Sequence, residues 1–513
     1  MRNALLAVVL VTLPLFAQND VGDVAFANSG APEAQEPFLR GLALLHNFEY
    51  PSAAEAFRKA QQVDPSFAMA YWGEAMTHTH PIWFQQDAEA ARAVLQRLGA
   101  TSDERLTKAK TERERDYLRT LDVLYGDGPK NERDFKYAAA MAALHARYPD
   151  DVDATAFYAL ALLGTAHQGR DFNIYMRAAS LLEEVFPSHL RHPGVLHYLI
   201  HSYDDPIHAP LGMRAARLYG AVAPNAGHAL HMTSHIFVAM GMWDDVIDAN
   251  RRAIAVVNRE RDAQSKPHGD CGHYPTWLHY AYLQQHRLDE ATKMLDRCRA
   301  FAFAPNFVAG GAMDTPKMRL MNYAEMRAHH AAGGAAVEVA TVPGGVDAPG
   351  ARFTLSYGDV LAASQRGDVD ALKKAVAQLH AVQKDALDAY EERSETNPSR
   401  RVRAEVIAQE ADALLLIAEG KRAEALAILE AAAKAERSLP LEFGPPDIAK
   451  PAAELLAEQL LAAGRAADAV AAYKLVFERA PGRTISVEGM QRAQKAAGQT
   501  QNAAETPAAG HVH

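Results

Sequence analysis

Histidine is concentrated in one stretch of this sequence. Of the 22 histidines in the chain, eight fall between residues 189 and 235, where an even distribution would place about two. The separation between His197 and His231 equals that between His201 and His235. That separation, about 34 residues, is the typical period of a two-helix repeat that stacks into a superhelix. The spacing therefore predicts that histidines recur at the same structural position of successive repeats.

Helical geometry predicts that these side chains converge. Four residues advance a helix by about 400°, so His197 and His201 share one face, and Asp204 falls about 20° from His197. A second helix should carry three histidines within about 60° of one face: His228, His231 and His235. Neighbouring helices pack about 8–10 Å apart, so imidazoles from both helices can reach a common point.

The chemistry that suits this arrangement is metal binding. Neutral imidazole is the commonest protein ligand for divalent transition metals, and aspartate adds charge and oxygen donors. Zinc and copper fit best, and iron(II) also accepts this ligand set. The predicted ligands are His197, His201, Asp204, Asp205, His228, His231, His235 and His273, with His167 and Cys271 as secondary candidates. Asp204, Asp205, Tyr198 and Tyr203 are candidates to orient the rings from behind.

Whether such a site is catalytic stays open, with a non-enzymatic role favoured. Hydrolytic zinc sites usually add a general base, as Glu does in H-E-x-x-H. Here the helix reads His197-Tyr-Leu-Ile-His201, with no Glu between the histidines. Asp204 or Asp205 could serve as the base of a metal-dependent hydrolase or oxidase. The sequence contains no serine nucleophile elbow, P-loop or dinucleotide fingerprint.

The elements that must position these residues are helices almost throughout. Apolar residues recur at helical spacing and strand-like alternation is absent, which predicts an all-α chain. Between Pro37 and Pro65, small residues and one aromatic, Phe57, occur where two packed helices need close approach, and Pro65 ends the second helix. In its placing of Gly41, Ala53, Phe57, Ala60 and Pro65 this segment resembles the tetratricopeptide (TPR) repeat family.

The histidine region, HPGVLHYLIHSYDDPIHAPLGMRAARLYG followed by HALHMTSHIFVAMGMWDDVI, resembles a group of bacterial exported TPR proteins. The resemblance implies a TPR-like α–α superhelix and no particular activity. In TPR units the first helices line a concave groove. The register implied by Gly241, Val246 and Ala253 places His197 and His231, and likewise His201 and His235, at equivalent groove positions. The same register puts His228, His273, Asp204, Asp205 and His167 on the groove side.

Composition and the N-terminus predict an exported protein. The apolar run Ala4–Phe16 follows Arg2 and is too short to span a bilayer, which is typical of a signal peptide cleaved after Ala17 or Ala27. No stable membrane insertion is expected after cleavage, and the protein should be periplasmic or secreted. The net charge of −10 argues against a nucleic-acid partner. The two cysteines, Cys271 and Cys298, could form one disulfide in an oxidising compartment or remain free.

Five segments are predicted along the chain: a signal peptide (1–27), an N-terminal TPR-like superhelix with the histidine groove (36–330), a Gly/Ala/Pro-rich linker (331–350), C-terminal TPR-like helices (351–491) and a disordered tail (492–513). Two functions follow from this organisation. In the first, the groove binds a transition metal ion for storage, delivery or metal-dependent chemistry. In the alternative, a periplasmic scaffold binds a peptide or protein partner in the same groove without metal.

Overall fold

The computed structural model describes residues 20–304, 315–338, 348–391 and 399–498, which form 23 α-helices, three short 3-10 helices and one strand pair. The first half contains α1 (Gln35–His46), α2 (Tyr50–Val63), α3 (Ala68–Met76), β1 (Thr79–His80), β2 (Gln85–Gln86), α4 (Ala88–Leu98), α5 (Ser102–Lys108), α6 (Glu112–Leu124), α7 (Lys130–Arg147), α8 (Val152–Leu163), α9 (Phe172–Val185), α10 (Pro193–Tyr203), α11 (Ala209–Val222) and α12 (Gly227–Ala239). The second half contains α13 (Trp243–Ala263), α14 (His273–Gln284), α15 (Leu288–Ala302), α16 (Pro316–Ala332), α17 (Pro349–Arg366), α18 (Val369–Glu391), α19 (Ser399–Ala418), α20 (Arg422–Arg437), α21 (Ala452–Ala462), α22 (Ala466–Phe477) and α23 (Thr484–Ala496).

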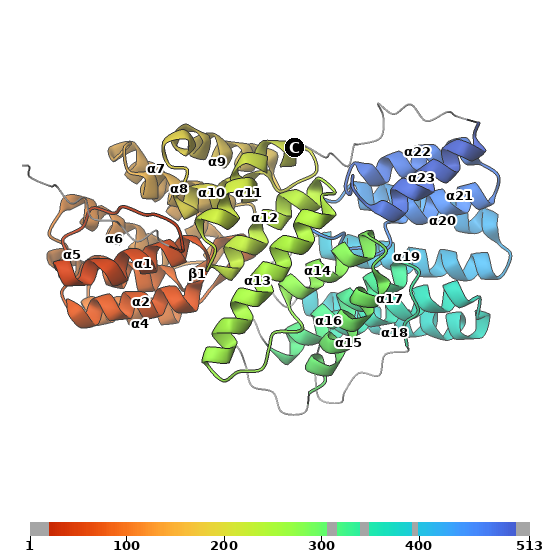
Figure 1. Cartoon of the computed structure of the whole chain (residues 1–513), viewed down its shortest axis with the longest axis horizontal. Helices are drawn as coiled ribbons and strands as arrows, with labels where there is room; N and C mark the ends of the chain where they lie inside the picture. Colours follow the sequence, from red (N-terminus) through yellow and green to blue (C-terminus); the bar gives the residue numbers. More distant parts are fainter. Residues whose placement is uncertain (1–19, 305–314, 339–347, 392–398, 499–513) are drawn as a thin grey trace, which may run out of the picture.

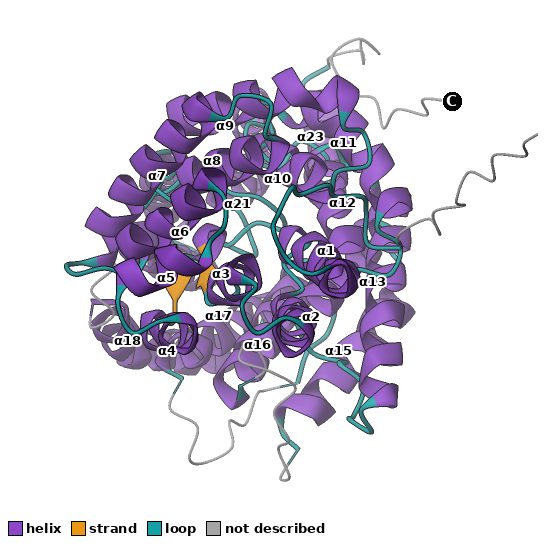
Figure 2. Ribbon diagram, turned by 90° about the vertical axis from the view of Figure 1, so that its left-hand side faces the viewer, coloured by secondary structure: helices purple, strands orange, loops and turns teal. Residues whose placement is uncertain are grey.

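The helices stack as successive hairpins into a superhelix. Each hairpin packs on the next, so that α10 contacts α8 and α12 as well as its sequence neighbours α9 and α11. Figure 1 shows the progression from the N-terminal helices at one end to α20–α23 at the other, and Figure 2 looks along this axis at the helices grouped around it. The predicted fold class, an all-α TPR-like superhelix, is confirmed.

Small residues permit the close helix contacts, as predicted. The ring of Phe57 on α2 lies between α1 and α3, where a Cβ at Gly41 would come within 2.9 Å of it and one at Gly73 within 2.3 Å. A larger residue at either glycine would force the hairpins apart, because close-packed interiors have little room to adjust. Phe57 is fully buried.

The C-terminal helices return to the middle of the chain. Trp243 Nε1 donates to the carbonyl of Gly482 at 3.1 Å, and the backbone of Gly482 packs directly on that of Gly241. Arg483, just before α23, contacts the Tyr280 hydroxyl on α14 at 3.3 Å. Gly444, between α20 and α21, packs against the ring of Trp277. The second half of the superhelix is therefore closed onto the histidine-bearing helices.

Three of the predicted segment boundaries can be compared with the structure. Residues 339–347 of the predicted linker lie outside the described residues, but α16 and α17 on either side of it pack against each other and share a hydrophobic core. The structure therefore does not divide at this point. The predicted disordered tail begins too early, because α23 continues to Ala496. Residues 499–513, like residues 1–19 of the predicted signal peptide, lie outside the described part.

Residues 20–27 pack onto the body of the protein. Val21 and Phe26 are buried in the main hydrophobic core, where Phe26 stacks on Trp72 at a centroid distance of 6.0 Å. Among the described residues, no helix is both long and apolar enough to cross a membrane.

A buried ion pair anchors the C-terminal closure and gives a first prediction. Arg483 and Glu454 form a double contact at 2.6 and 3.0 Å with both side chains buried. Because Glu454→Gln leaves the guanidinium without its carboxylate, we expect a loss of about 3–5 kcal/mol in the free energy of unfolding, measured by urea denaturation. The exposed pair Lys384–Asp388 provides the control, since Asp388→Asn should change stability very little. Equal effects of the two substitutions would contradict this account.

Candidate metal centre

Two helices and the start of a third bring six histidines together. His197 and His201 lie on α10, His228, His231 and His235 on α12, and His273 at the first position of α14. α10 and α12 pack side by side, which places their equivalent histidines opposite each other. The rings form a continuous array with these centroid distances: His197–His201 4.9 Å, His197–His228 5.0 Å, His201–His235 5.6 Å, His231–His235 5.0 Å and His231–His273 4.6 Å.

The first set of three histidines is fully enclosed. One ring nitrogen of each of His197, His201 and His228 lies within 4.8 Å of the other two. His197 Nδ1 donates to the carbonyl of His46 at 2.6 Å, and His201 Nδ1 donates to Asp204 Oδ2 at 3.3 Å. Because these acceptors cannot donate, Nε2 of both rings carries a lone pair. The Nε2 atoms of all three histidines are buried without a hydrogen-bond partner among the described residues.

The second set consists of His231, His235 and His273. Asn250 donates its amide to the carbonyl of Val246 at 2.9 Å, which turns its Oδ1 toward His231 Nδ1 at 2.7 Å. His235 Nδ1 donates to Asp204 Oδ2 at 2.9 Å. Both acceptors hold the proton on Nδ1, so the Nε2 atoms of His231 and His235 face each other at 3.2 Å with lone pairs on both. A cation bound by both nitrogens would relieve the repulsion between the two lone pairs.

Asp204 orients the rings and is itself fixed by Arg170. Its Oδ2 accepts from both His201 and His235, and its Oδ1 is paired with the buried Arg170 guanidinium. Burial raises the pKa of Asp204. The Arg170 charge and the two imidazole contacts lower it by a larger amount, so the pKa lies below its usual range. With its oxygens occupied in this way, Asp204 lies as an acceptor behind two of the candidate ligands, one of the two roles predicted for it. With His201 and His235 it also forms one of the described groups of potential ligands.

Asp205 faces away from the array. Its Oδ1 accepts the backbone N–H groups of Ile207 and His208, and its Oδ2 accepts from the His208 ring at 2.9 Å. Arg170 completes its surroundings at 3.4 Å. Asp205 belongs to none of the described groups of potential ligands. It therefore supports Arg170 and the start of α11.

Five imidazoles of the array are neutral near pH 7: those of His197, His228, His231, His235 and His273. Burial, reinforced by the neighbouring rings, lowers the pKa of His197, His228 and His231 well below the ordinary imidazole range. Burial also lowers the pKa of His235 to about 4, although the contact with Asp204 raises it. Neutral imidazole is the form that binds metal, so these rings need not release a proton first.

In a third group, His46, Asp153 and His192, both rings hydrogen-bond to the same aspartate oxygen. His46 Nε2 and His192 Nε2 both donate to Asp153 Oδ1, at 2.9 and 3.2 Å. The remaining ring nitrogens accept, His46 Nδ1 from the Tyr198 hydroxyl and His192 Nδ1 from the Val195 N–H. All four imidazole nitrogens of this group are partnered, and its one atom without a hydrogen-bond partner among the described residues is Asp153 Oδ2. The group positions the His46 carbonyl that holds His197.

The two secondary candidates lie apart from the array. His167 pairs with Asp134 at 2.9 Å and belongs to none of the described ligand groups. Cys271 forms a disulfide with Cys298, at a Cα–Cα distance of 4.3 Å. The disulfide was one of the two predicted states of these cysteines, and the prediction that Cys271 could supply a thiolate ligand is wrong.

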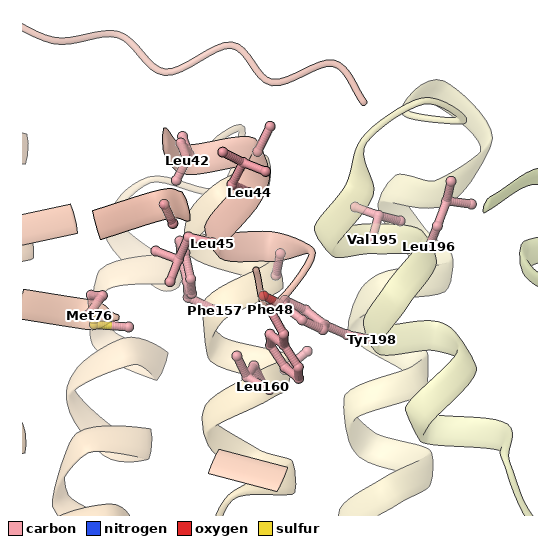
Figure 3. Packing of buried hydrophobic residues seen from close by; sticks show 14 of the residues in the cluster. Leu42, Leu44, Leu45, Phe48, Met76, Phe157, Leu160, Val195, Leu196 and Tyr198 are labelled. Carbon is pink, nitrogen blue, oxygen red and sulfur yellow. The ribbon is translucent and has the colours of Figure 1, made fainter. Parts of the chain in front are cut away.

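Aromatic side chains enclose the array. Phe48, in the left-handed region at φ 57°, contacts all three rings of the first set, and Figure 3 shows it with Tyr198 between the end of α1 and α10. Trp277 and Phe443 stack on His235 at 4.5 and 4.8 Å. His273, in contrast, is exposed and lines a cavity of about 440 Å³. The array is therefore covered at the first set and accessible at the second.

Several residues of this site could not be identified from the sequence. His46 and Asp153 lie far before His197 in the chain, and Phe443 lies far after it, between α20 and α21. Arg170 and Asn250 carry no local motif. The backbone approach at Gly194, where a Cβ would come within 2.3 Å of His46 Nδ1, is visible only in three dimensions.

Comparisons with known proteins add little beyond the fold. No protein-family model and no curated protein matches this chain. Similar solved structures include yeast Tom70 (TM-score 0.32, 11% identity, 91% of this chain and 96% of that chain) and the APC/C hetero-tetramer Cut9-Hcn1 (0.34, 10%, 91% and 78%). The P58(IPK) TPR domain is also similar (0.21, 12%, 92% and 99%). Likeness at this level carries no inference about ligands or partners.

The disulfide yields a second prediction. Replacing both Cys271 and Cys298 by serine should lower the free energy of unfolding by about 3 kcal/mol, because the closed loop of 27 residues gains freedom in the unfolded chain. Metal content, measured by elemental analysis, should not change, because neither sulfur is a ligand. A loss of bound metal in a variant that remains folded would show that the sulfur is a ligand after all.

Proposed function

We propose that this protein is exported and binds a divalent transition metal ion at His197, His201 and His228. The single observation that carries the proposal is the set of three buried Nε2 atoms without partners among the described residues, on three rings that each bring one nitrogen within 4.8 Å of the other two. An unpartnered buried polar atom costs about 1–3 kcal/mol, and native proteins contain few of them. An ion that accepts all three lone pairs removes this cost.

The surroundings of these nitrogens support the proposal. Two of the three rings have the Nδ1 proton held by an oxygen acceptor, which is the usual arrangement behind a metal-binding histidine. Three imidazoles suit zinc, which takes three or four protein ligands, and copper accepts the same nitrogen donors. Iron(II) remains the third candidate. Storage, delivery and metal-dependent chemistry are all compatible with this ligand set.

The scaffold alternative finds less support at these residues. His197, His201, His231 and His235 are at most 3% exposed, so a peptide in the groove would not reach them. A peptide would have to occupy the cavity of about 440 Å³ beside His273 instead. Protein binding elsewhere along a TPR-like superhelix stays compatible with the fold, and it becomes the preferred function if metal is absent.

Elemental analysis of untagged protein tests the proposal. We expect at least one equivalent of zinc, copper or iron after dialysis, and an increase in Tm when the metal is restored to the stripped protein, since a ligand at 100 times its Kd stabilises by about 2.7 kcal/mol. His201→Gln should abolish the increase in Tm. His380→Gln, at an exposed histidine paired with Asp412, is the matched control and should behave as wild type.

Two results would contradict the proposal. One is stripped protein that gains no thermal stability from zinc, copper or iron(II) and retains far less than one equivalent. The other is a His201→Gln variant, folded by circular dichroism, that binds metal as the wild type does.

Export is proposed together with metal binding. The apolar N-terminal run supports it, and so does the Cys271–Cys298 disulfide, because disulfides persist in oxidising compartments and are rare in the cytosol. Of the two predicted cleavage sites, the one after Ala27 would remove the buried side chains of Val21 and Phe26. We therefore favour cleavage after Ala17.

Intact-mass analysis of the secreted or periplasmic protein tests this choice. The mature chain should begin at Gln18 and retain Val21 and Phe26. A mature chain that begins at Asn28, or a full-length chain that stays in the cytoplasm, would contradict the prediction.

A further inference from the structure

We infer that the histidine array holds two metal ions, the second bound by His231, His235 and His273. This inference rests on the proposed function, because it assigns a second ion beside the first. It starts from the Nε2 atoms of His231 and His235, which face each other at 3.2 Å although both carry lone pairs. Two nitrogens on one tetrahedral zinc ion, each at about 2.0–2.1 Å, are separated by about 3.3 Å. The observed spacing is that of two ligands of one ion.

One ion cannot satisfy all six histidines. The six rings form two sets of three, each with one nitrogen per ring gathered within 4.8 Å, and the sets have no member in common. A further group, His201, Asp204 and His235, joins one ring of each set through the carboxylate. Zinc takes three or four ligands in protein sites, so six imidazoles exceed its capacity. Two ions with three imidazoles each use every ring of the array.

The two positions are neighbours. The rings of His201 and His235, one from each set, lie 5.6 Å apart, and those of His228 and His231 lie 6.1 Å apart. Asp204 Oδ2 accepts the Nδ1–H of both His201 and His235, so one carboxylate oxygen orients a ligand of each ion. Paired metal sites with a short separation hold a small ligand between the ions.

The two sites differ in their access to solvent. The first lies under Phe48, whereas His273 of the second is exposed to the cavity of about 440 Å³. All six proposed ligands are imidazoles. Of the carboxylates beside them, Asp204 is paired with Arg170, and Glu49 accepts the backbone N–H of His228 at 2.9 Å. Two divalent ions in this environment need a negative counter-charge. The cavity beside His273 offers carboxylates of its own, because Glu325 and Asp447 line it.

Metal stoichiometry tests the inference separately from the proposed function. Stripped protein titrated with zinc should bind two equivalents by elemental analysis after gel filtration. His273→Ala removes a ligand whose side chain is exposed, so the fold should survive, and this variant should retain one tight equivalent. His380→Ala is the matched exposed control and should retain two.

Each alternative outcome is decisive. One equivalent in wild type overturns the second site and leaves the proposed function intact, and no bound zinc, copper or iron(II) overturns both. Two tight equivalents in folded His273→Ala would place the second ion elsewhere and overturn the assignment.

Asn250 provides an independent test as a positioning residue. Asn250→Ala removes the acceptor behind His231, and loss of such an acceptor typically weakens metal affinity by about 10–100-fold. The second equivalent should weaken by this factor in a chelator competition while the first stays unchanged. Asn250→Asp keeps the acceptor oxygen and should restore the second site. Equal weakening of both equivalents, or none, would contradict the role.

Discussion

The structure of the site depends on where the protons of buried imidazoles are held. A neutral imidazole has one donor nitrogen and one acceptor nitrogen, and in a dry interior each needs a partner. At His197, His201, His231 and His235 the partner of Nδ1 is an oxygen of the protein: a carbonyl, the Asp204 carboxylate or the Asn250 amide. All four rings therefore turn their lone pairs to the same interior. The buried Arg170 keeps Asp204 ionised and so keeps this arrangement in place.

The repeat architecture places the same arrangement of histidines on successive hairpins. α10 and α12 are equivalent elements of successive hairpins. The pair His197 and His201 on α10 therefore recurs at the same helix positions as His231 and His235 on α12. α14 adds His273 at its start, and the closure by the C-terminal half brings Phe443 over His235. A solenoid usually leaves its inner surface open to solvent, whereas here much of that surface is covered by the chain itself.

The fold and the histidines of the array could be predicted because they leave local signals. The repeat period and the spacing of the histidines within each helix depend only on helix geometry, so the pairs on α10 and α12 were predictable. The residues behind them were not, because His46, Arg170 and Asn250 reach the site through long-range packing that no spacing encodes. The distinction between Asp204 and Asp205 illustrates the same limit. The two are adjacent in sequence, but the end of α10 sends one carboxylate toward the rings and the other toward His208.

The position of Phe443 has a consequence for the order of events during biosynthesis. The last proposed ligand along the chain is His273, whereas Phe443, part of the aromatic cover of the array, follows only after six further helices, α15 to α20. A growing chain presents its N-terminal part first, and helical hairpins can form as they emerge. The ligand array can thus assemble while it is still uncovered, and the C-terminal helices close over it afterwards. Under the proposed function, capture of an ion and its enclosure would be separate steps.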